Sequence, residues 1–349
     1  MSQGMQEPWI QNLENVYHRA QHVLSWAFIG VGFAGSIGNI LTLRVFTKMG
    51  CSNTFQISCS ALAVSDLCCV IAFLICGITN LLGSNFGDGA FFYVGNFVGI
   101  TFSRTTALIT AWLSLERCLC VAFPTKVKLI ITHTLTRVVL LAIFFIGGSI
   151  LFIALMVFGI KFNDDSQSNK TSVIFREYEQ PRLNGFQQLL MLLVGLFIPV
   201  FSWVSVTICT TFLIVKLKKT VNWRRVNAQA APVWSTETRG VETSQNQSRS
   251  VKEKRAMKVV IAVAGIFLIC TAPNSAHLLA SFVLRDYFFD GSLRYLFAIN
   301  SMLCMLLTQL NSSINMIVFA VLGYNFRSTL LQVLSEGFST LCCGRFSTH

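Results

Sequence analysis

The sequence predicts an all-α membrane protein, a bundle of seven transmembrane helices followed by a short cytoplasmic amphipathic helix. Hydrophobic residues make up 53% of the 349 residues and charged residues only 12%, whereas soluble domains usually carry about 25% charged residues. Seven apolar stretches are also long enough to cross a bilayer, which takes about 20 residues of helix. Lipid, and not water, is therefore the main solvent of this chain.

The seven predicted helices form one domain over residues 23–321. They cover about 23–46, 54–78, 92–118, 136–160, 186–215, 256–284 and 295–321. The N-terminal segment 1–22 is polar and lacks the pattern of a cleaved signal peptide, so we expect the first apolar stretch to direct insertion. The connection 216–255 is rich in Gln, Ser, Thr, Asn and Arg, which predicts a flexible loop. The tail 322–349 holds the expected amphipathic helix at 325–337.

Loop charge predicts how the chain is oriented. The segment from Lys216 to Lys258 carries eleven Lys and Arg residues against three Glu, while the connections on the other side of the membrane contain more acidic than basic residues. Because basic loops stay in the cytoplasm, the positive-inside rule places the N-terminus outside the cell and the C-terminus in the cytoplasm.

Several classes of protein are disfavoured by residue types and their spacing. The 12 Cys include no CxxC pair and there is no His cluster, so no zinc site is indicated. The basic residues flank apolar spans instead of forming a stripe, which argues against a nucleic-acid partner. No constellation of His, Cys, Asp and Glu converges at one membrane depth, which argues against an enzyme. A transporter or channel stays the alternative, although internal repeats are not evident.

Ionisable residues inside the spans are candidates for function because they are costly in lipid. They are Asp66 in the second span, and Arg104 and the pair Glu116-Arg117 in the third. We expect Asp66 to lie in a polar cluster with Asn39, Thr106, Asn311 and Asn315, because a buried carboxylate needs hydrogen bonds or a cation. The alternative is that these residues only join helices together.

Short motifs in these spans give the chain a recognisable family likeness. They are Gly38-Asn39-Ile40-Leu41, Leu62-Ala63-Val64-Ser65-Asp66-Leu67, Glu116-Arg117-Cys118, Pro199, Phe267 with Cys270-Thr271-Ala272-Pro273, and Asn311-Ser312-Ser313-Ile314-Asn315. In order and spacing the chain resembles rhodopsin-like (class A) G-protein-coupled receptors over residues 23–337. Within that family it looks most like molluscan chemosensory-type or peptide-type receptors.

The resemblance implies a function and its partners. The function would be that of a plasma-membrane receptor. Its partners would be an extracellular peptide or small chemical ligand and, on the cytoplasmic side, a heterotrimeric G protein. It also implies specific sites. The ligand pocket would include Gly99, Ser103, Arg104, Thr271 and Gln309, a sodium ion would bind at Asp66, and the switch would comprise Glu116, Arg117 and Glu253, with glycosylation at Asn169 and palmitoylation at Cys342 and Cys343.

Two positions narrow the ligand class by resemblance. Gly99 stands where amine receptors have Asp, and Gln309 stands where opsins have the retinal-binding Lys, so neither class is favoured. Arg104 lies 13 residues before Arg117, roughly 20 Å nearer the outer face at 1.5 Å per residue. We expect it to line the pocket and to favour ligands with an acidic group or a carbonyl-rich end, against a purely structural role.

The chain also departs from the family pattern. Phe92 replaces the Cys that usually ties the third helix to the second outer loop, and that loop, 161–185, has no Cys either. Thr271 replaces the Trp of the sixth helix, and Met316 and Phe319 replace the Pro and Tyr of the seventh. A receptor-like protein that no longer activates a G protein is therefore a second alternative.

Overall fold

The computed structural model describes most of the chain. The described residues are 8–82, 95, 97–123, 130–157, 160–165, 170–175, 185, 189, 192–230, 242–284, 286–287 and 291–343. Seven of the helices within these ranges are long and apolar enough to cross a membrane. This confirms the predicted all-α bundle of seven spans.

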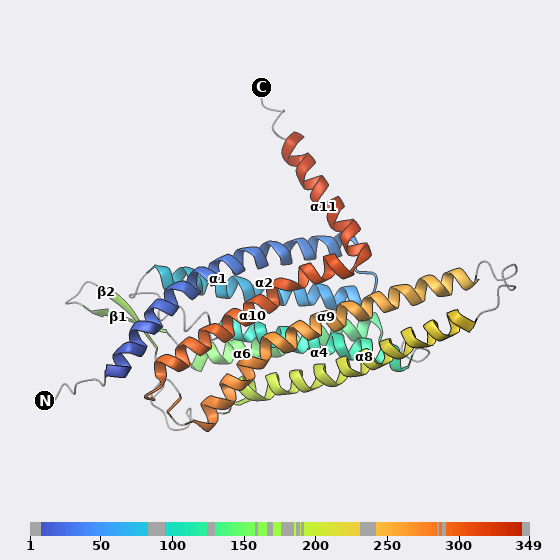
Figure 1. The fold of residues 1–349 in the computed structure, drawn as a ribbon. Coiled ribbons are helices and arrows are strands. Elements are labelled where there is room, and N and C mark those ends of the chain that lie inside the picture. The colour runs from blue at the N-terminus through green and yellow to red at the C-terminus, as the bar shows by residue number, and fades with distance from the viewer. Residues whose placement is uncertain are drawn as a thin grey trace.

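The spans are formed by long helices that follow one another along the chain (Figure 1). They are α1 (Pro8–Lys48), α2 (Thr54–Leu81), α4 (Ile100–Ala122), α6 (His133–Val157), α8 (Ile198–Ala230), α9 (Glu242–Val283) and α10 (Arg294–Leu322). A π-helical turn, η2 (Leu192–Phe197), precedes α8, and α11 (Tyr324–Cys343) follows the last span. Strands β1 (Ile160–Asp165) and β2 (Lys170–Phe175) add an antiparallel hairpin, which the sequence analysis did not predict.

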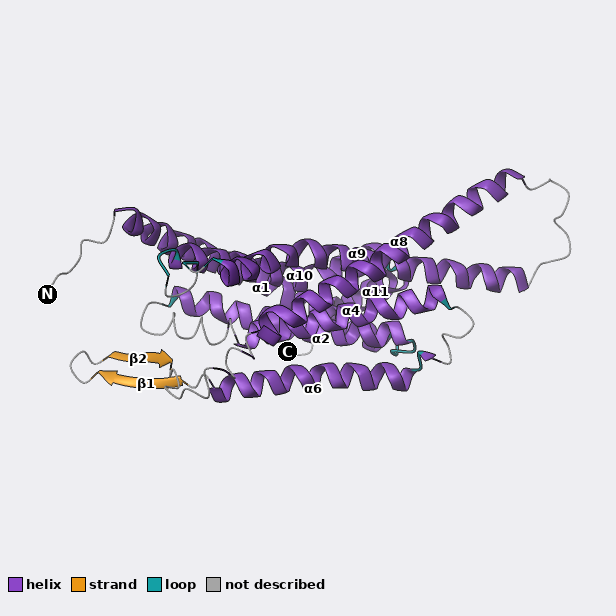
Figure 2. Ribbon diagram, turned by 90° about the horizontal axis from the view of Figure 1, so that it is seen from below, coloured by secondary structure: helices purple, strands orange, loops and turns teal. Residues whose placement is uncertain are grey.

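The bundle has two distinct ends. The start of α1 and the strands β1 and β2 lie at one end, called here the N-terminal end, and the end of α8 and the start of α9 lie at the other, the C-terminal end (Figure 2). α11 also starts at the C-terminal end, where it turns away from the bundle axis (Figure 1). The first span therefore begins and the last span ends at opposite ends of the bundle, as an odd number of spans requires.

α4 lies at the centre of the bundle and α6 lies at its edge. In the most apolar window of each span, 50% of the α4 residues are buried but only 22% of those in α6. α4 contacts α2, α6, α8 and α9, whereas α1 packs mainly against α2 and α10. Large apolar side chains such as Phe145 on α6 and Ile208 on α8 are more than 60% exposed. Such exposure suits a lipid surround, where apolar side chains need no cover.

Several helices extend beyond the apolar stretches that predicted them. α1 begins at Pro8 and not near residue 23, and α8 and α9 continue into the predicted loop 216–255, so that only 231–241 lies outside the described residues. Hydropathy locates the part of a helix that lies in lipid, but a helix ends where a cap or breaker stops it. Pro8 suits a first helical position, because it has no N–H to leave unbonded there.

Aromatic packing fixes α11 to the bundle at its first turns. The rings of Phe46, Phe319 and Phe326 lie 5.4 to 5.7 Å from one another, joining α1, α10 and α11. Further along, Lys48 and Glu336 form an exposed ion pair at 2.5 Å. The predicted amphipathic helix is thus present, and it runs past the expected residue 337 to Cys343.

Candidate functional site

A buried carboxylate lies in the middle of the bundle between three helices. Asp66 on α2 is fully buried. Its two carboxylate oxygens accept hydrogen bonds from Thr106 Oγ1 on α4, at 3.0 Å, and from Asn315 Nδ2 on α10, at 2.7 Å. Thr106 also lies 2.9 Å from the hydroxyl of Ser65. Three residues of the expected polar cluster therefore contact one another directly.

The other two members of the expected cluster lie close by without touching Asp66 in a hydrogen bond. Asn39 Nδ2 donates to the backbone carbonyls of Gly35 and Ser312, each at 3.0 Å, and so joins α1 to α10. Asn311 is buried and lines a cavity together with Thr106 and Ser312. The cluster thus extends from α1 across α10 to α4.

The residues around Asp66 fit a small hard cation. Ser312 Oγ and Asn315 Oδ1 are buried oxygens with no hydrogen-bond partner in the described part of the chain. Oxygen ligands of this kind, together with a carboxylate, are what hard cations prefer. Within the described ranges no group of three or more His, Cys, Asp and Glu is arranged to hold a metal. The chemistry therefore suits sodium better than a transition metal.

A narrow cavity lies nearer the N-terminal end, between α4, α8, α9 and α10. Ser103 and Arg104 on α4, Thr271 and Asn274 on α9, and Pro199 on α8 line it. Arg104 is only 7% exposed. With the Asn274 amide turned so that its oxygen faces the guanidinium, Oδ1 accepts from the two Nη atoms at 3.2 and 3.3 Å. The Arg104 Nε has no hydrogen-bond partner among the described residues.

Two residues expected in the ligand pocket lie elsewhere. Gly99 packs against Phe73, whose ring would lie 2.8 Å from a Cβ at this position. Gln309 is fully buried, and its Nε2 donates to the backbone carbonyls of Phe28 and Val70 at 3.0 and 3.4 Å. Gly99 therefore packs against α2, whereas Gln309 is hydrogen-bonded to both α1 and α2. Their expected place came from the family pattern, which does not take account of how each residue is packed here.

Asn274 lines the cavity although no sequence motif marked it. The amide directly follows Pro273, in a part of α9 that also contains Thr271, Ser275 and His277. A polar residue there was a usable signal, since a side-chain amide in a span needs a hydrogen-bond partner. Only the fold shows that this partner is Arg104.

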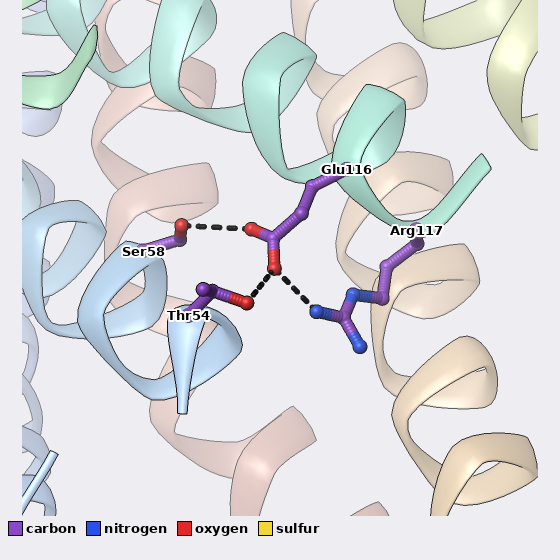
Figure 3. A network of polar contacts seen from close by, with 4 residues as sticks. All are labelled: Thr54, Ser58, Glu116 and Arg117. Atoms are coloured by element: carbon purple, nitrogen blue, oxygen red, sulfur yellow. Dashed lines mark hydrogen bonds and ion pairs between the residues drawn. The ribbon is translucent and has the colours of Figure 1, made fainter. Parts of the chain in front are cut away.

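A third polar site lies at the C-terminal end of α4 (Figure 3). Glu116 is fully buried and points toward α2, where Thr54 and Ser58 donate hydrogen bonds to its two carboxylate oxygens at 2.5 and 3.0 Å. Arg117 forms an ion pair with the same carboxylate. The guanidinium carbon of Arg117 also lies 5.1 Å from the centre of the Phe55 ring, within the range of a cation–π contact. Glu116 thus ties α4 to the start of α2.

Some predicted site residues are outside the described part of the structure. Glu253 belongs to α9, but its side chain is not among those described. Asn169 lies outside the described residues altogether, and so does Phe92. Cys342 and Cys343 end α11, and their side chains are not described. The roles expected for these residues stay predictions.

The chain matches the model of a known protein family. The model of the family described as 7 transmembrane receptor (rhodopsin family) matches residues 38–319. This range is well over half of the 349 residues and extends from α1 to α10. It contains the Asp66 cluster, the Arg104 cavity and the Glu116 site.

Proposed function

Because the chain belongs to the rhodopsin family of seven-transmembrane receptors, we propose that it binds an extracellular peptide or small chemical ligand and activates a heterotrimeric G protein. The N-terminal end of the bundle would face the outside of the cell and the C-terminal end the cytoplasm, in the plasma membrane. The observation that supports this best is the buried cavity around Arg104, which four helices share. A ligand there would contact several helices at once.

The mechanism follows from where the cavity meets α9. Thr271 and Asn274 line the cavity on either side of Pro273. Pro has no N–H and its ring crowds the preceding turn, so the helix bends more easily at this point. A ligand that binds one bend of α9 better than another shifts the equilibrium between them, and with it the position of the inner part of α9.

The resting state would be held by polar contacts at the C-terminal end. We propose that Glu253 on α9 pairs with Arg117 in that state, alongside the pair that Arg117 forms with Glu116. A partly exposed pair of this kind contributes about 1 kcal/mol. Glu253→Ala should therefore raise ligand-independent guanine-nucleotide exchange about fivefold at unchanged expression. Basal exchange equal to that of the parent protein would contradict the proposed pair.

Sodium at Asp66 would stabilise the same resting state. Its ligands would be the Asp66 carboxylate and the unpartnered oxygens of Ser312 and Asn315. Agonist affinity that falls as NaCl replaces a salt of a large organic cation would support this role. Affinity that is independent of sodium would leave Asp66 a residue that only bonds neighbouring helices. At the surface, glycosylation at Asn169 and palmitoylation at Cys342 and Cys343 are proposed as well.

The test of the proposed function is a ligand screen in cells that carry a promiscuous G protein, followed by nucleotide exchange with purified receptor. Ligand-stimulated exchange that is lost in Arg117→Ala would support G-protein activation. Ligand binding without exchange, across several G-protein classes, would favour the alternative of a receptor-like protein that does not signal. Ligand-dependent uptake into vesicles would favour the transporter alternative.

A further inference from the structure

We propose that the ligand is a free single-chain amphiphile with a carboxylate head, which binds at Arg104 while its tail lies in an apolar groove between α4, α6 and α8. The statement that this amphiphile is the ligand of a signalling receptor rests on the proposed function. The binding itself can be measured without any signalling. The proposal rests on two features. Arg104 has no counter-ion among the described residues, and two cavities meet at its side chain.

The charge of Arg104 lacks a counter-ion in the described part of the chain. The two ion pairs found there are Lys48 with Glu336 and Arg117 with Glu116. A buried cation without an anion is costly in a membrane protein, so such residues mark binding sites more often than surface charges do. The neutral amide of Asn274 compensates only a part of this cost, because it carries no charge.

The free N–H groups of Arg104 suit a carboxylate in number and geometry. A guanidinium has five N–H donors, and Asn274 Oδ1 accepts from one on each Nη. Three N–H groups remain, and two of them, the Nε–H and the Nη–H beside it, point in parallel. Two parallel donors bind the two oxygens of one carboxylate, which is stronger and more selective than a single bond. The unpartnered Nε is thus the atom that points to the class of head group.

The tail is assigned to a second cavity that Arg104 also lines. Besides Arg104, this groove is formed by Thr101, Thr105 and six residues without polar side-chain atoms: Leu108, Ile146, Gly147, Ile150, Val194 and Ile198. The hydroxyls of Thr101 and Thr105 donate to the carbonyls of Phe97 and Thr101 in their own helix. The wall of the groove therefore offers methyl and methylene groups, which suit an alkyl chain.

The groove opens toward the lipid at its α6 side. Ile146 is 47% exposed, and α6 is the span at the edge of the bundle. Gly147 lets α6 approach α4 closely, because a Cβ there would lie 2.5 Å from Thr105 Oγ1. This contact leaves no room for a ligand between Gly147 and Thr105, so we place the entry of the alkyl chain beside the exposed Ile146.

The depth of Arg104 favours a free amphiphile over a bilayer phospholipid. The apolar stretch of the third span begins at about residue 92, twelve residues before Arg104, so that Arg104 lies roughly 18 Å along the helix from the start of that stretch. A phospholipid would have to move its head group out of the membrane interface, and both of its acyl chains would have to move with it. A single-chain acid can bring its carboxylate to this depth, because attraction to the charge of Arg104 replaces the hydration that the carboxylate loses.

The experiment measures binding of tritiated myristic acid to the full chain in phosphatidylcholine nanodiscs. We expect saturable binding that unlabelled myristic acid displaces, while methyl myristate, which has the same tail without the charge, competes at least about 10-fold less well. Arg104→Gln should weaken binding by about the same factor. Ile146→Trp, which fills the mouth of the groove, should weaken it about fivefold. The matched control is Phe145→Trp, at a position that is 76% exposed on the same helix, and it should leave binding unchanged.

Three outcomes would overturn the proposal. They are equal competition by myristic acid and its methyl ester, unchanged binding in Arg104→Gln, and loss of binding when phosphatidylserine replaces about a tenth of the lipid, which would assign the groove to a bilayer lipid. Thermal unfolding of each variant shows whether it is folded. If Arg104→Gln does not fold, Ile146→Trp still tests whether the ligand binds in the groove. Myristate binding without nucleotide exchange would contradict only the proposed signalling, whereas exchange driven by another ligand, without myristate binding, would contradict only this inference.

Discussion

Glu116 and Arg104 are two buried charges on the same helix, α4, and they are treated in opposite ways. Glu116 receives hydrogen bonds from Thr54 and Ser58 and pairs with the cation of Arg117. Arg104 faces one neutral amide, and its Nε has no partner among the described side chains. A charge with a full set of partners holds helices together. A charge that lacks them is kept at a cost to stability, and such a cost is expected where a ligand supplies the missing partner.

The largest effect is expected from removing the well-partnered charge. Glu116→Leu leaves the Arg117 guanidinium and two hydroxyls without their acceptor, so the free energy of unfolding should fall by about 3 kcal/mol. Thermal unfolding in detergent measures this loss. Leu115→Ala is the matched control, because Leu115 is adjacent and 41% exposed, and it should change stability by less than about 0.5 kcal/mol. Equal losses in the two variants would mean that the network adds nothing beyond packing.

Asp66→Asn is the next test, because Asp66 has donors but no cation among its hydrogen-bond partners. An Asn there keeps one acceptor oxygen and turns an NH₂ group toward Thr106 or toward the NH₂ of Asn315. One donor is left unpaired, which should cost about 2 kcal/mol. The exchange Asp66→Asn with Asn315→Asp restores a donor opposite an acceptor and should recover most of that loss. No recovery in the double variant would show that the direct bond is not what matters.

Arg104→Met tests the other half of the comparison. Met has a similar length and no charge to desolvate, so the ligand-free protein should keep its stability or gain about 1 kcal/mol. The same thermal measurement, made beside Glu116→Leu, gives the contrast directly. A loss of 3 kcal/mol, as expected for Glu116→Leu, would mean that Arg104 is a structural residue whose partners hold the bundle.

The smallest effect is expected at the exposed pair between Lys48 and Glu336. Its side chains are 34% and 68% exposed, so water and salt screen the attraction and its loss should cost at most about 0.5 kcal/mol. Lys48→Ala should leave thermal unfolding nearly unchanged, and high salt should remove what difference there is. By contrast, Phe46→Ala removes an aromatic contact that joins α1 to α10 and α11, so it serves as the destabilising control.

The sequence was sufficient to predict the seven spans and the family, because lipid imposes a length and an apolarity that can be counted. The same rule does not locate the ends of α1, α8 and α9, which depend on caps and on packing outside the bilayer. The polar cluster around Asp66 was predictable because an intramembrane carboxylate needs donors. The partners of Glu116 were not, since Thr54 and Ser58 are more than 50 residues away in the chain and resemble any other hydroxyl of an apolar span.

Packing also decides which family positions keep their usual role. Gly99 and Gln309 were expected in the pocket from the family resemblance, but here Gly99 packs against α2 and Gln309 joins α10 to α1 and α2. Asn274, which the motifs do not mark, takes their place beside Arg104. A side chain's direction depends on the helix rotation and on its neighbours, and neither can be read from a motif.

The part of α9 between Arg255 and Pro273 converts a small bend at the proline into a larger displacement at the C-terminal end of the bundle. From Pro273 to Arg255, where the apolar span begins, the helix extends for roughly 27 Å at 1.5 Å per residue. A tilt of about 10° at the proline then moves the far end of this arm by roughly 5 Å, about one helical turn in pitch. A small change of helix direction beside Asn274 thus moves the C-terminal end of the bundle by roughly half the diameter of a helix.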